Sequence, residues 1–400
     1  MISLEEIKEM SLVSASKIVM LVIDGLGGLP DAAGQTELEI ARTPYLDELA
    51  EKSVCGLVDP VSPGITPGSG PGHLALFGYD PLKFTIGRGV LEALGIGFEL
   101  TKNDVAARGN FCTTDNDGLI TDRRAGRITT EKCTELSKLL SQIKLSGIEV
   151  FVWPVKEHRF MLLLRGDALS PEINDTDPQR LGVAPNVAMA ERPKAKDTTR
   201  IVNIFIDAAK KILSNHHPAN MILLRGFSKL PEIPKMGEIY KLTPAAIAVY
   251  PMYKGLAKLL GMKIFSVEGD VREEFRILAS CFEKHDFFYV HVKHADSAGE
   301  DGDFSRKVKV IEEVDSALPQ LLSLKPDVIV ITGDHSTPAM LKMHSWHPVP
   351  VMLYSHWCRP DHVMQFSESA CLSGGLGRLH SADIMPLAMA NALKLTKFGA

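Results

Sequence analysis

The sequence predicts an α/β fold in which a mostly parallel sheet is covered by helices on both faces. Short apolar, β-branched runs alternate with segments of helical periodicity, the pattern of parallel strands joined by crossover helices. The runs lack the polar alternation of half-exposed strands, so we expect both faces of the sheet to be buried. Two of them, far apart in the chain, are followed by metal-type side chains, and open α/β sheets bind ligands at the carboxyl ends of strands.

The elements of this sheet domain follow in chain order. Buried parallel strands are predicted at Ile18–Ile23, Phe287–Val292, Val328–Thr332 and Val349–Tyr354. Helices are predicted at Pro44–Ser53, Asp303–Leu324 and Ser381–Leu393. In the second of these helices, apolar residues recur every three or four positions from Val308 to Leu321, which predicts one buried face.

The middle of the chain indicates a smaller α/β domain inserted into the first. Its predicted strands are Ala106–Cys112, Glu149–Pro154, Arg159–Leu164 and Met221–Arg225, and its predicted helices are Thr130–Ile143 and Thr198–Ser214. Arginine and histidine are frequent here, and a polar, proline-rich stretch lies between Leu169 and Asp197. We assign residues 1–100 and 236–400 to the discontinuous sheet domain and residues 101–235 to the inserted domain.

Composition excludes several classes of protein. A net charge of −5 argues against a general nucleic-acid binder. No apolar run approaches the ~20 residues that span a bilayer, and the acidic N-terminus lacks the apolar stretch of a signal peptide. The six cysteines form no CxxC pair, which is typical of free thiols in a reducing compartment. We therefore expect a cytoplasmic protein without nucleic-acid or membrane partners; the sequence predicts no oligomeric state.

Metal-type side chains follow two of the predicted strands. Asp24 ends the first strand and is followed by glycines, which would let a cation approach; alone, it could equally cap a turn. Asp334 and His335 follow the strand Val328–Thr332, where a bend would turn both toward one ion. Mixed oxygen and nitrogen donors suit Zn²⁺ or Mn²⁺. Together, the two strand ends predict a metal site.

A second group of ligands is predicted after the strand Phe287–Val292. Asp296 and Glu300 are four residues apart, so a tight loop or one helical turn would direct both at the same ion. A solvated acidic loop is the alternative. A histidine would join them from just before the last strand, either His344 or His347, and spacing alone does not choose between these two.

Ser69 is the candidate nucleophile. The glycine-rich segment Thr66–His73 leaves its hydroxyl accessible, and an apolar helix is expected to begin just after it. Helix N-termini stabilise phosphate oxygens through free backbone N–H groups. A serine hydroxyl requires activation, which metal coordination can supply, whereas a flexible loop with an ordinary serine is the alternative.

A basic cluster in this acidic chain indicates anion binding. Arg123, Arg124 and Arg127 lie close together in the inserted domain. Arginine binds carboxylate and phosphate in bidentate fashion, although a charged surface loop would have the same composition. With the two ligand groups and the serine, the cluster predicts a two-metal enzyme that acts on phosphate esters.

These motifs occur together in one known family. Over nearly its whole length the chain resembles the cofactor-independent (2,3-bisphosphoglycerate-independent) phosphoglycerate mutases of the archaeal type, within the alkaline phosphatase superfamily. The resemblance is carried by Val22-Ile23-Asp24-Gly25, Thr66-Pro67-Gly68-Ser69-Gly70-Pro71, Phe77-Gly78-Tyr79-Asp80-Pro81, Asp122-Arg123-Arg124-Ala125-Gly126-Arg127, Gly299-Glu300-Asp301-Gly302-Asp303 and Gly333-Asp334-His335-Ser336-Thr337-Pro338. It implies an alkaline-phosphatase-like metal-binding core domain, an inserted substrate-binding and phosphotransferase domain, and interconversion of 3-phosphoglycerate and 2-phosphoglycerate through a phosphoserine.

The resemblance also implies roles for individual residues. Ser69 corresponds to the nucleophile, and the ligands of one metal are Asp24, Ser69, Asp334 and His335. The ligands of the other metal are Asp296, Glu300 and His344, which the family places four residues before Pro-Val-Pro. The implied substrate-binding residues are Arg123, Arg124, Arg127, His158, Arg159, Arg225 and Lys254.

The implied cofactors are two divalent ions, with Mn²⁺ preferred and Co²⁺, Zn²⁺ or Mg²⁺ as alternatives, and no 2,3-bisphosphoglycerate. One position departs from the family pattern Asp-x-x-x-His, because Glu300 replaces the histidine. A carboxylate adds negative charge and favours a harder ion. The alternatives to a mutase are a related metal-dependent phosphotransferase or phosphomonoesterase (homoserine-kinase-like) acting on another small phosphate ester, and a metal- and phosphate-binding regulator without turnover.

Overall fold

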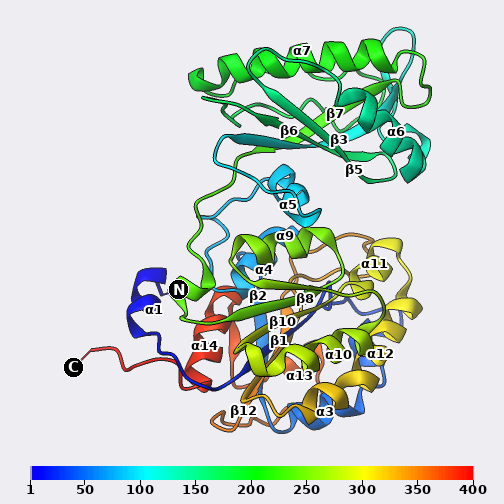
Figure 1. Ribbon diagram of the computed structural model, residues 1–400. Coiled ribbons are helices and arrows are strands. Elements are labelled where there is room, and N and C mark those ends of the chain that lie inside the picture. Colours follow the sequence, from blue (N-terminus) through cyan, green and yellow to red (C-terminus); the bar gives the residue numbers. More distant parts are fainter. Residues whose placement is uncertain (1, 400) are drawn as a thin grey trace. The chain divides into compact units, whose positions relative to one another are not determined.

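The computed structural model describes residues 2–399, and their contacts divide the chain into two units (Figure 1). The sheet unit runs up to Thr85 and resumes at Ile233, and the insert unit is Ile86–Glu232. The second boundary lies close to the predicted one. The first lies earlier than residue 100, because α5 (Arg88–Gly95) packs on β3 and β7 of the insert unit.

The sheet unit contains an eight-stranded sheet in the order β13-β2-β12-β11-β1-β10-β8-β9. Its strands are β1 (Ile18–Ile23), β2 (Val54–Asp59), β8 (Pro244–Ala248), β9 (Lys263–Ser266), β10 (Phe287–Val292), β11 (Val328–Thr332), β12 (Val349–Ser355) and β13 (Gly377–His380). The four strands predicted for this sheet are all present, and the mostly parallel α/β architecture is confirmed. The other four strands, β2, β8, β9 and β13, were not predicted; β8, for example, has the short, alanine-rich sequence PAAIA.

Strand β12 runs antiparallel to both of its neighbours, β11 and β2, so the prediction of a parallel strand at Val349–Tyr354 is wrong. All other pairs in this sheet are parallel. The segment between β11 and β12 contains no helix that could carry the chain back to the opposite edge of the sheet. The chain therefore re-enters from the edge at which β11 ends, and this requires the antiparallel direction.

Helices cover both faces of the sheet, as predicted (Figure 1). One group comprises α2 (Glu37–Ile40), α3 (Pro44–Ala50), α10 (Val271–Cys281), α11 (His294–Asp301), α12 (Phe304–Ser323) and α13 (Glu368–Cys371). A second group comprises α4 (Ser69–Leu76), α9 (Pro251–Leu259) and α14 (Ile384–Asn391). The remaining helices of the unit are α1 (Leu4–Met10) and α8 (Met236–Ile239). Helix α12 buries the predicted apolar face and begins after Asp303, whose side chain accepts a hydrogen bond from Arg306 N.

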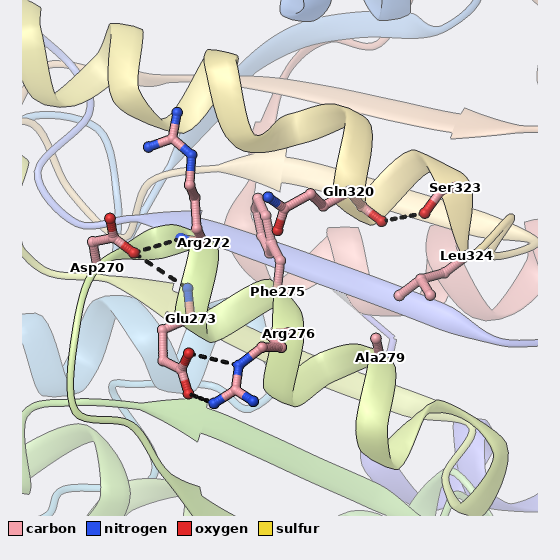
Figure 2. A pocket seen from close by; sticks show the side chains of 9 residues that line it. All are labelled: Asp270, Arg272, Glu273, Phe275, Arg276, Ala279, Gln320, Ser323 and Leu324. Atoms are coloured by element: carbon pink, nitrogen blue, oxygen red, sulfur yellow. Dashed lines mark hydrogen bonds and ion pairs between the residues drawn. The ribbon is translucent and has the colours of Figure 1, made fainter.

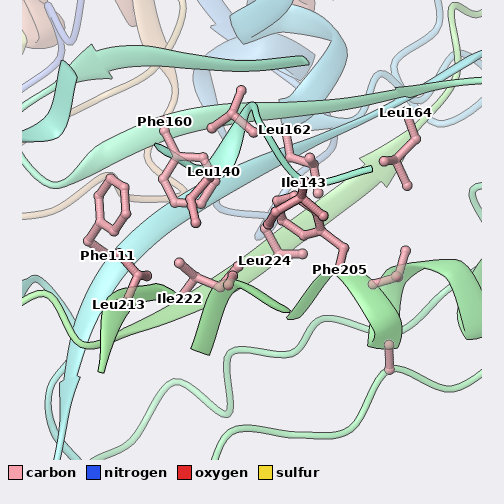
Figure 3. Packing of buried hydrophobic residues seen from close by; sticks show 14 of the residues in the cluster. Phe111, Leu140, Ile143, Phe160, Leu162, Leu164, Phe205, Leu213, Ile222 and Leu224 are labelled. Atoms are coloured by element: carbon pink, nitrogen blue, oxygen red, sulfur yellow. The ribbon is translucent and has the colours of Figure 1, made fainter. Parts of the chain in front are cut away.

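The insert unit is built on a five-stranded sheet in which every pair is antiparallel. Its strands are β3 (Asp104–Thr114), β4 (Ile120–Asp122), β5 (Glu149–Lys156), β6 (Arg159–Arg165) and β7 (Met221–Ser228), and its longer helices are α6 (Thr130–Leu140) and α7 (Lys196–Leu213). Figure 3 shows the main core of this unit, in which Phe111 lies against Phe160 with 4.7 Å between ring centroids, and Phe205 of α7 belongs to the same cluster. None of the helices in residues 2–399 has the length and apolar character needed to cross a bilayer.

Candidate metal centre

Three adjacent parallel strands, β11, β1 and β10, end level with one another and deliver three aspartates to one edge of the sheet. In the register, Ile23 of β1 pairs with Val292 of β10, and Val22 pairs with Thr332 of β11. Asp24 directly follows β1, Asp334 lies in the loop after β11, and Asp296 lies in the first turn of α11, after β10. Residues that are far apart in the sequence therefore converge because their strands are neighbours.

The first ligand group consists of Asp24, Asp334 and His335, whose ligand atoms lie within 4.8 Å of one another. His335 Nε2 is 3.3 Å from Asp24 Oδ1 and 3.1 Å from Asp334 Oδ2. All three side chains are fully buried, and neither of these carboxylate oxygens has a hydrogen-bond donor. Buried carboxylate oxygens are costly unless a charge or donor faces them, so this donor set fits a divalent cation.

The candidate nucleophile lies against this group. Ser69 is the first residue of α4, and its Oγ is 3.3 Å from His335 Nε2. His73, one helical turn later, has its Nδ1 2.9 Å from Ser69 O and 3.1 Å from Asp334 Oδ2. The helix that presents the hydroxyl is thus tied to a member of the ligand group.

The second ligand group consists of Asp296, His335 and His344, again within 4.8 Å of one another. His344 Nε2 is 3.5 Å from Asp296 Oδ1, and its ring stacks on that of His335 with 3.6 Å between centroids. Glu300 lies outside this group: its Oε1 is 3.9 Å from His344 Nε2 and its side chain is 55% exposed. Between the two candidate histidines, the structure places His344 here, whereas His347 faces Ser345 Oγ.

Hydrogen bonds orient both imidazoles toward the ligand groups. Thr337 Oγ1 donates to Asp296 Oδ1 at 2.7 Å and accepts from His335 Nδ1 at 2.9 Å, since a hydroxyl has one proton. His344 Nδ1 donates to Pro67 O at 3.0 Å, because a carbonyl can only accept. Each histidine therefore turns Nε2 toward the aspartates, which is the orientation of a metal-ligating imidazole held by an outer partner.

The charges at this edge favour a cation. Burial opposes the ionised form of Asp296, but the hydrogen bond with His344 and the nearby Lys293 hold its pKa below the usual range. Burial opposes ionisation of Asp334 as well, and His335 and His73 hold its pKa well below the usual range. Burial would lower the pKa of His344, yet its hydrogen bond with Asp296 raises it to about 9. The carboxylates are thus ionised and attract positive charge.

Several polar residues around Asp24 were not predicted from the sequence. Lys293 Nζ is 3.1 Å from Asp24 Oδ2 and also forms an ion pair with Asp296. Tyr253, on α9, donates a hydrogen bond to Asp24 Oδ2, and His291 Nε2 lies 3.2 Å from the same oxygen. For Lys293 the sequence did contain a signal: it lies three residues before Asp296, just ahead of the start of α11, a spacing at which the two side chains can form an ion pair. Tyr253 lies on α9, 229 residues from Asp24 in the sequence, and no local pattern could have predicted its contact with Asp24.

The insert unit gathers most of the predicted substrate-binding residues. Arg123 pairs with Asp177 through two bonds, Nε–Oδ1 at 2.9 Å and Nη2–Oδ2 at 2.6 Å, and Arg225 pairs with the same aspartate at 3.7 Å. His158 is buried, and its pKa is lowered to about 4 by burial and by neighbouring Arg159, with smaller contributions from other arginines.

For the other three predicted substrate-binding residues, Arg124, Arg127 and Lys254, the structure shows different surroundings from the carboxylate pairs of Arg123 and Arg225. The backbone N–H of Arg124 donates to Asp122 Oδ1 at 2.7 Å, and Arg127 closes a short turn with a positive φ of 53°. Lys254 belongs to the sheet unit, on α9, where its Nζ is 3.5 Å from Ser266 Oγ. Arg108, on β3, is not among the predicted residues; its Nε is 3.5 Å from Glu92 Oε1.

A surface cavity of about 460 Å³ lies elsewhere in the sheet unit, between α10 and α12 (Figure 2). Its charged groups already have partners within the chain. Glu273 pairs with Arg276, and Asp270 caps α10 by accepting from Arg272 N and Glu273 N. It contains none of the predicted site residues, and we assign no function to it.

Comparison with known proteins finds relatives along almost the whole chain. A sequence model of the family described as 2,3-bisphosphoglycerate-independent phosphoglycerate mutase matches residues 50–220. The chain is 51% identical over 396 residues to a probable 2,3-bisphosphoglycerate-independent phosphoglycerate mutase of Thermosipho africanus, covering 98% of each chain. It is 49% identical over 400 residues to a probable enzyme of the same name from Thermus thermophilus, again covering 98% of each.

Two solved structures share the fold along the whole chain. A protein of Pyrococcus horikoshii superimposes with a TM-score of 0.84 at 30% identity, covering 97% of this chain and 100% of that one. A cofactor-independent phosphoglycerate mutase of Thermoplasma acidophilum superimposes with a TM-score of 0.74 at 33% identity, covering 94% and 100%. With relatives near 50% identity over almost the full length, the predicted family is confirmed: the chain belongs to the 2,3-bisphosphoglycerate-independent phosphoglycerate mutases.

Proposed function

We propose that this protein interconverts 3-phosphoglycerate and 2-phosphoglycerate without 2,3-bisphosphoglycerate. The names of the relatives support the reaction. The observation that carries the proposal is the position of the Ser69 hydroxyl, 3.3 Å from His335 Nε2, because His335 belongs to both ligand groups. A nucleophile at the junction of two cation positions suits in-line displacement at phosphorus, in which both the attacking and the leaving oxygen require stabilisation.

We propose that two divalent cations bind at the sheet edge. The ligands of one would be Asp24, Ser69, Asp334 and His335, and the ligands of the other Asp296, Glu300 and His344. The donor set combines carboxylate oxygens with imidazole nitrogens, which supports Mn²⁺ first and Co²⁺, Zn²⁺ or Mg²⁺ as alternatives. When bound, such ions neutralise phosphoryl oxygens and lower the pKa of a coordinated hydroxyl.

The residues of the chain then carry the transfer in two steps. Ser69 Oγ loses its proton and attacks the phosphorus of 3-phosphoglycerate; the bond from phosphorus to O3 breaks, and that oxygen takes a proton. The O2 hydroxyl of the glycerate loses its proton and attacks the phosphoserine, whereupon the bond to Ser69 Oγ breaks and the serine is reprotonated. Because Ser69 opens α4, the backbone N–H groups of Ser69 and Gly70 have no partner within the helix and are available to phosphoryl oxygens.

Retaining the glycerate between the two steps is the proposed role of the basic side chains. Arg159 Nε and His158 Nδ1 are buried and lack hydrogen-bond partners, which supports a polar ligand there. Arg123 and Arg225 are held by Asp177, so their guanidinium groups are pre-organised. Arg124, Arg127 and Lys254 complete the proposed set. If water reached the phosphoserine first, the enzyme would act as a phosphatase.

A coupled assay for 2-phosphoglycerate tests the proposal. We expect turnover of 3-phosphoglycerate that is abolished by a chelator, restored by Mn²⁺ and unchanged by added 2,3-bisphosphoglycerate. Release of free phosphate in place of 2-phosphoglycerate would favour a phosphomonoesterase. Absence of any phosphorylated Ser69 with each of the four metals would contradict the phosphoserine mechanism.

A further inference from the structure

We propose that Thr337 is a positioning residue that couples the two cation positions, an inference that depends on the proposed metal centre. Thr337 lies in the loop after β11, three residues beyond Asp334, and is fully buried. It contacts all three segments that carry the aspartates. No ligand role is required of it, because its hydroxyl is already committed to two ligand side chains.

The side chain of Thr337 joins the two ligand groups. Its Oγ1 donates to Asp296 Oδ1 at 2.7 Å and accepts from His335 Nδ1 at 2.9 Å. Asp296 belongs to the second group only, whereas His335 belongs to both. The Thr337 hydroxyl donates its hydrogen bond to the carboxylate, so toward His335 it can only accept, and this selects the His335 tautomer with its proton on Nδ1. That tautomer leaves Nε2 free to bind a cation.

The backbone of Thr337 joins the same loop to the segment after β1. Thr337 N donates to Gly27 O at 3.0 Å. Lys307, which is fully buried on α12, donates from Nζ to Gly27 O and to Thr337 O, each at 3.0 Å. A buried ammonium thus holds the loops that follow β1 and β11 together, three residues from Asp24 and two residues from His335.

Two glycines make room for Thr337. A Cβ at Gly25, where φ is +69°, would lie 2.7 Å from Thr337 Oγ1 and 2.9 Å from Asp296 Cα. A Cβ at Gly299 would lie 2.2 Å from Thr337 O and 2.9 Å from Thr337 Cγ2. Gly299 is inside α11, where glycine is less favourable for the helix than alanine. The close approach of Thr337 accounts for a glycine at this position.

Loss of the hydroxyl should therefore weaken both cation positions. Asp296 would lose the donor that orients it, and His335 would be free to place its proton on Nε2, which then cannot bind a metal. Removing outer partners of metal ligands typically reduces metal affinity by about 10–100-fold. We expect a reduction of this size for both binding steps.

The experiment compares Thr337→Ser with Thr337→Ala, because these variants differ from each other by one oxygen atom and both lose the methyl group. Mn²⁺ is titrated into the chelator-treated full-length protein, and free Mn²⁺ is followed by electron paramagnetic resonance. The serine variant should bind Mn²⁺ like the unsubstituted protein. The alanine variant should bind about 10–100-fold more weakly in both steps, and excess Mn²⁺ should restore its turnover.

A matched control is Thr199→Val in the insert unit, whose buried hydroxyl donates only to Ala195 O within its own helix. It should leave both Mn²⁺ affinities unchanged. Equal affinities for the serine and alanine variants would overturn the role of Thr337. So would an alanine variant that stays inactive at saturating Mn²⁺, since the hydroxyl would then serve folding. A failure of the unsubstituted protein to bind Mn²⁺ would instead remove the metal centre itself.

Discussion

The two ligand groups share His335 but differ in their exposure to water. Asp24, Asp334 and His335 are fully buried, and two of their carboxylate oxygens lack hydrogen-bond donors. In the second group the His344 side chain is 20% exposed, and the neighbouring Glu300 is 55% exposed. Electrostatic attraction is stronger where water is excluded, so we expect the first position to bind its cation more tightly and the second to exchange it more readily.

The origin of this difference is topological. The first group lies within three residues of the ends of two central, adjacent strands: Asp24 directly follows β1, and Asp334 and His335 follow β11. The second draws Asp296 from α11 and His344 from the long segment before β12. Loops and helix termini are more accessible than the ends of central strands. One sheet edge can therefore build a deep position, which takes His335, and beside it an open position, which takes His344.

The largest expected effect is that of Ser69→Ala, which removes the nucleophile but none of the charged ligands. We expect turnover to fall by at least about 10³-fold, because no other group can accept the phosphoryl. Both cations should remain, since the aspartates and histidines are untouched. The coupled assay and metal analysis after desalting measure the two properties. Substantial remaining turnover would remove Ser69 from the mechanism.

The comparison between the groups is tested by Asp334→Asn and Asp296→Asn, which remove the same charge from each position. Asp334→Asn should abolish the tighter Mn²⁺ binding step, and Asp296→Asn should weaken the looser step. Both reductions should exceed the roughly 100-fold expected for an outer partner. Mn²⁺ titration resolves the two steps. Identical effects of the two variants on one step would show that the positions are not separate.

The metal-free protein should lose stability between about pH 6.5 and pH 9. The pKa of His344 is raised to about 9 in the fold, mainly by Asp296 against the effect of burial, from about 6.5 in an unfolded chain. Protonated His344 stabilises the fold, and this contribution is complete below the pKa of the unfolded chain. It disappears as the pH rises through the pKa of the folded protein. The free energy of unfolding should fall by at most about 3 kcal/mol across this range. Denaturant unfolding in the presence of a chelator, repeated at several pH values, measures this change.

His344→Gln is the control for this pH dependence, because the raised pKa of His73 acts in the same direction. The pH-dependent loss should shrink in His344→Gln and remain in the unsubstituted protein. In the same window, affinity at the open position should increase with pH as His344 loses its proton. A pH-independent unfolding free energy would contradict the ion pair between His344 and Asp296.

The smallest effect is expected for Glu300, because its side chain is exposed and its carboxylate is 3.9 Å from His344 Nε2. Glu300→Gln should weaken only the looser Mn²⁺ step, by no more than about 10-fold, since exposed charges contribute little. Glu300→His should shift metal preference from Mg²⁺ toward Zn²⁺ or Co²⁺. A loss as large as that of Asp296→Asn would show that Glu300 holds the second cation as strongly as Asp296 does, and no loss at all would remove Glu300 from the proposed ligands.

Much of this architecture could be predicted from the sequence. The apolar runs that became β1, β10 and β11 are local signals, and the carboxyl ends of parallel strands must share an edge. The strands and helices predicted between residues 101 and 235 lie in the insert unit, whose first boundary precedes α5. No sequence pattern predicted α5. Its assignment to the insert unit comes from its packing on β3 and β7.

The sequence by itself determined which side chains could bind a cation, since ligand chemistry belongs to residue type and strand ends are encoded locally. Spacing left His344 and His347 open, and the family resemblance chose His344, which the structure places in the second group. Only the tertiary structure decided that β12 runs antiparallel and that Thr337, Lys307 and Tyr253 surround the ligands. These depend on hydrogen bonds between segments distant in the chain, and such partners are brought together only when the sheet has formed.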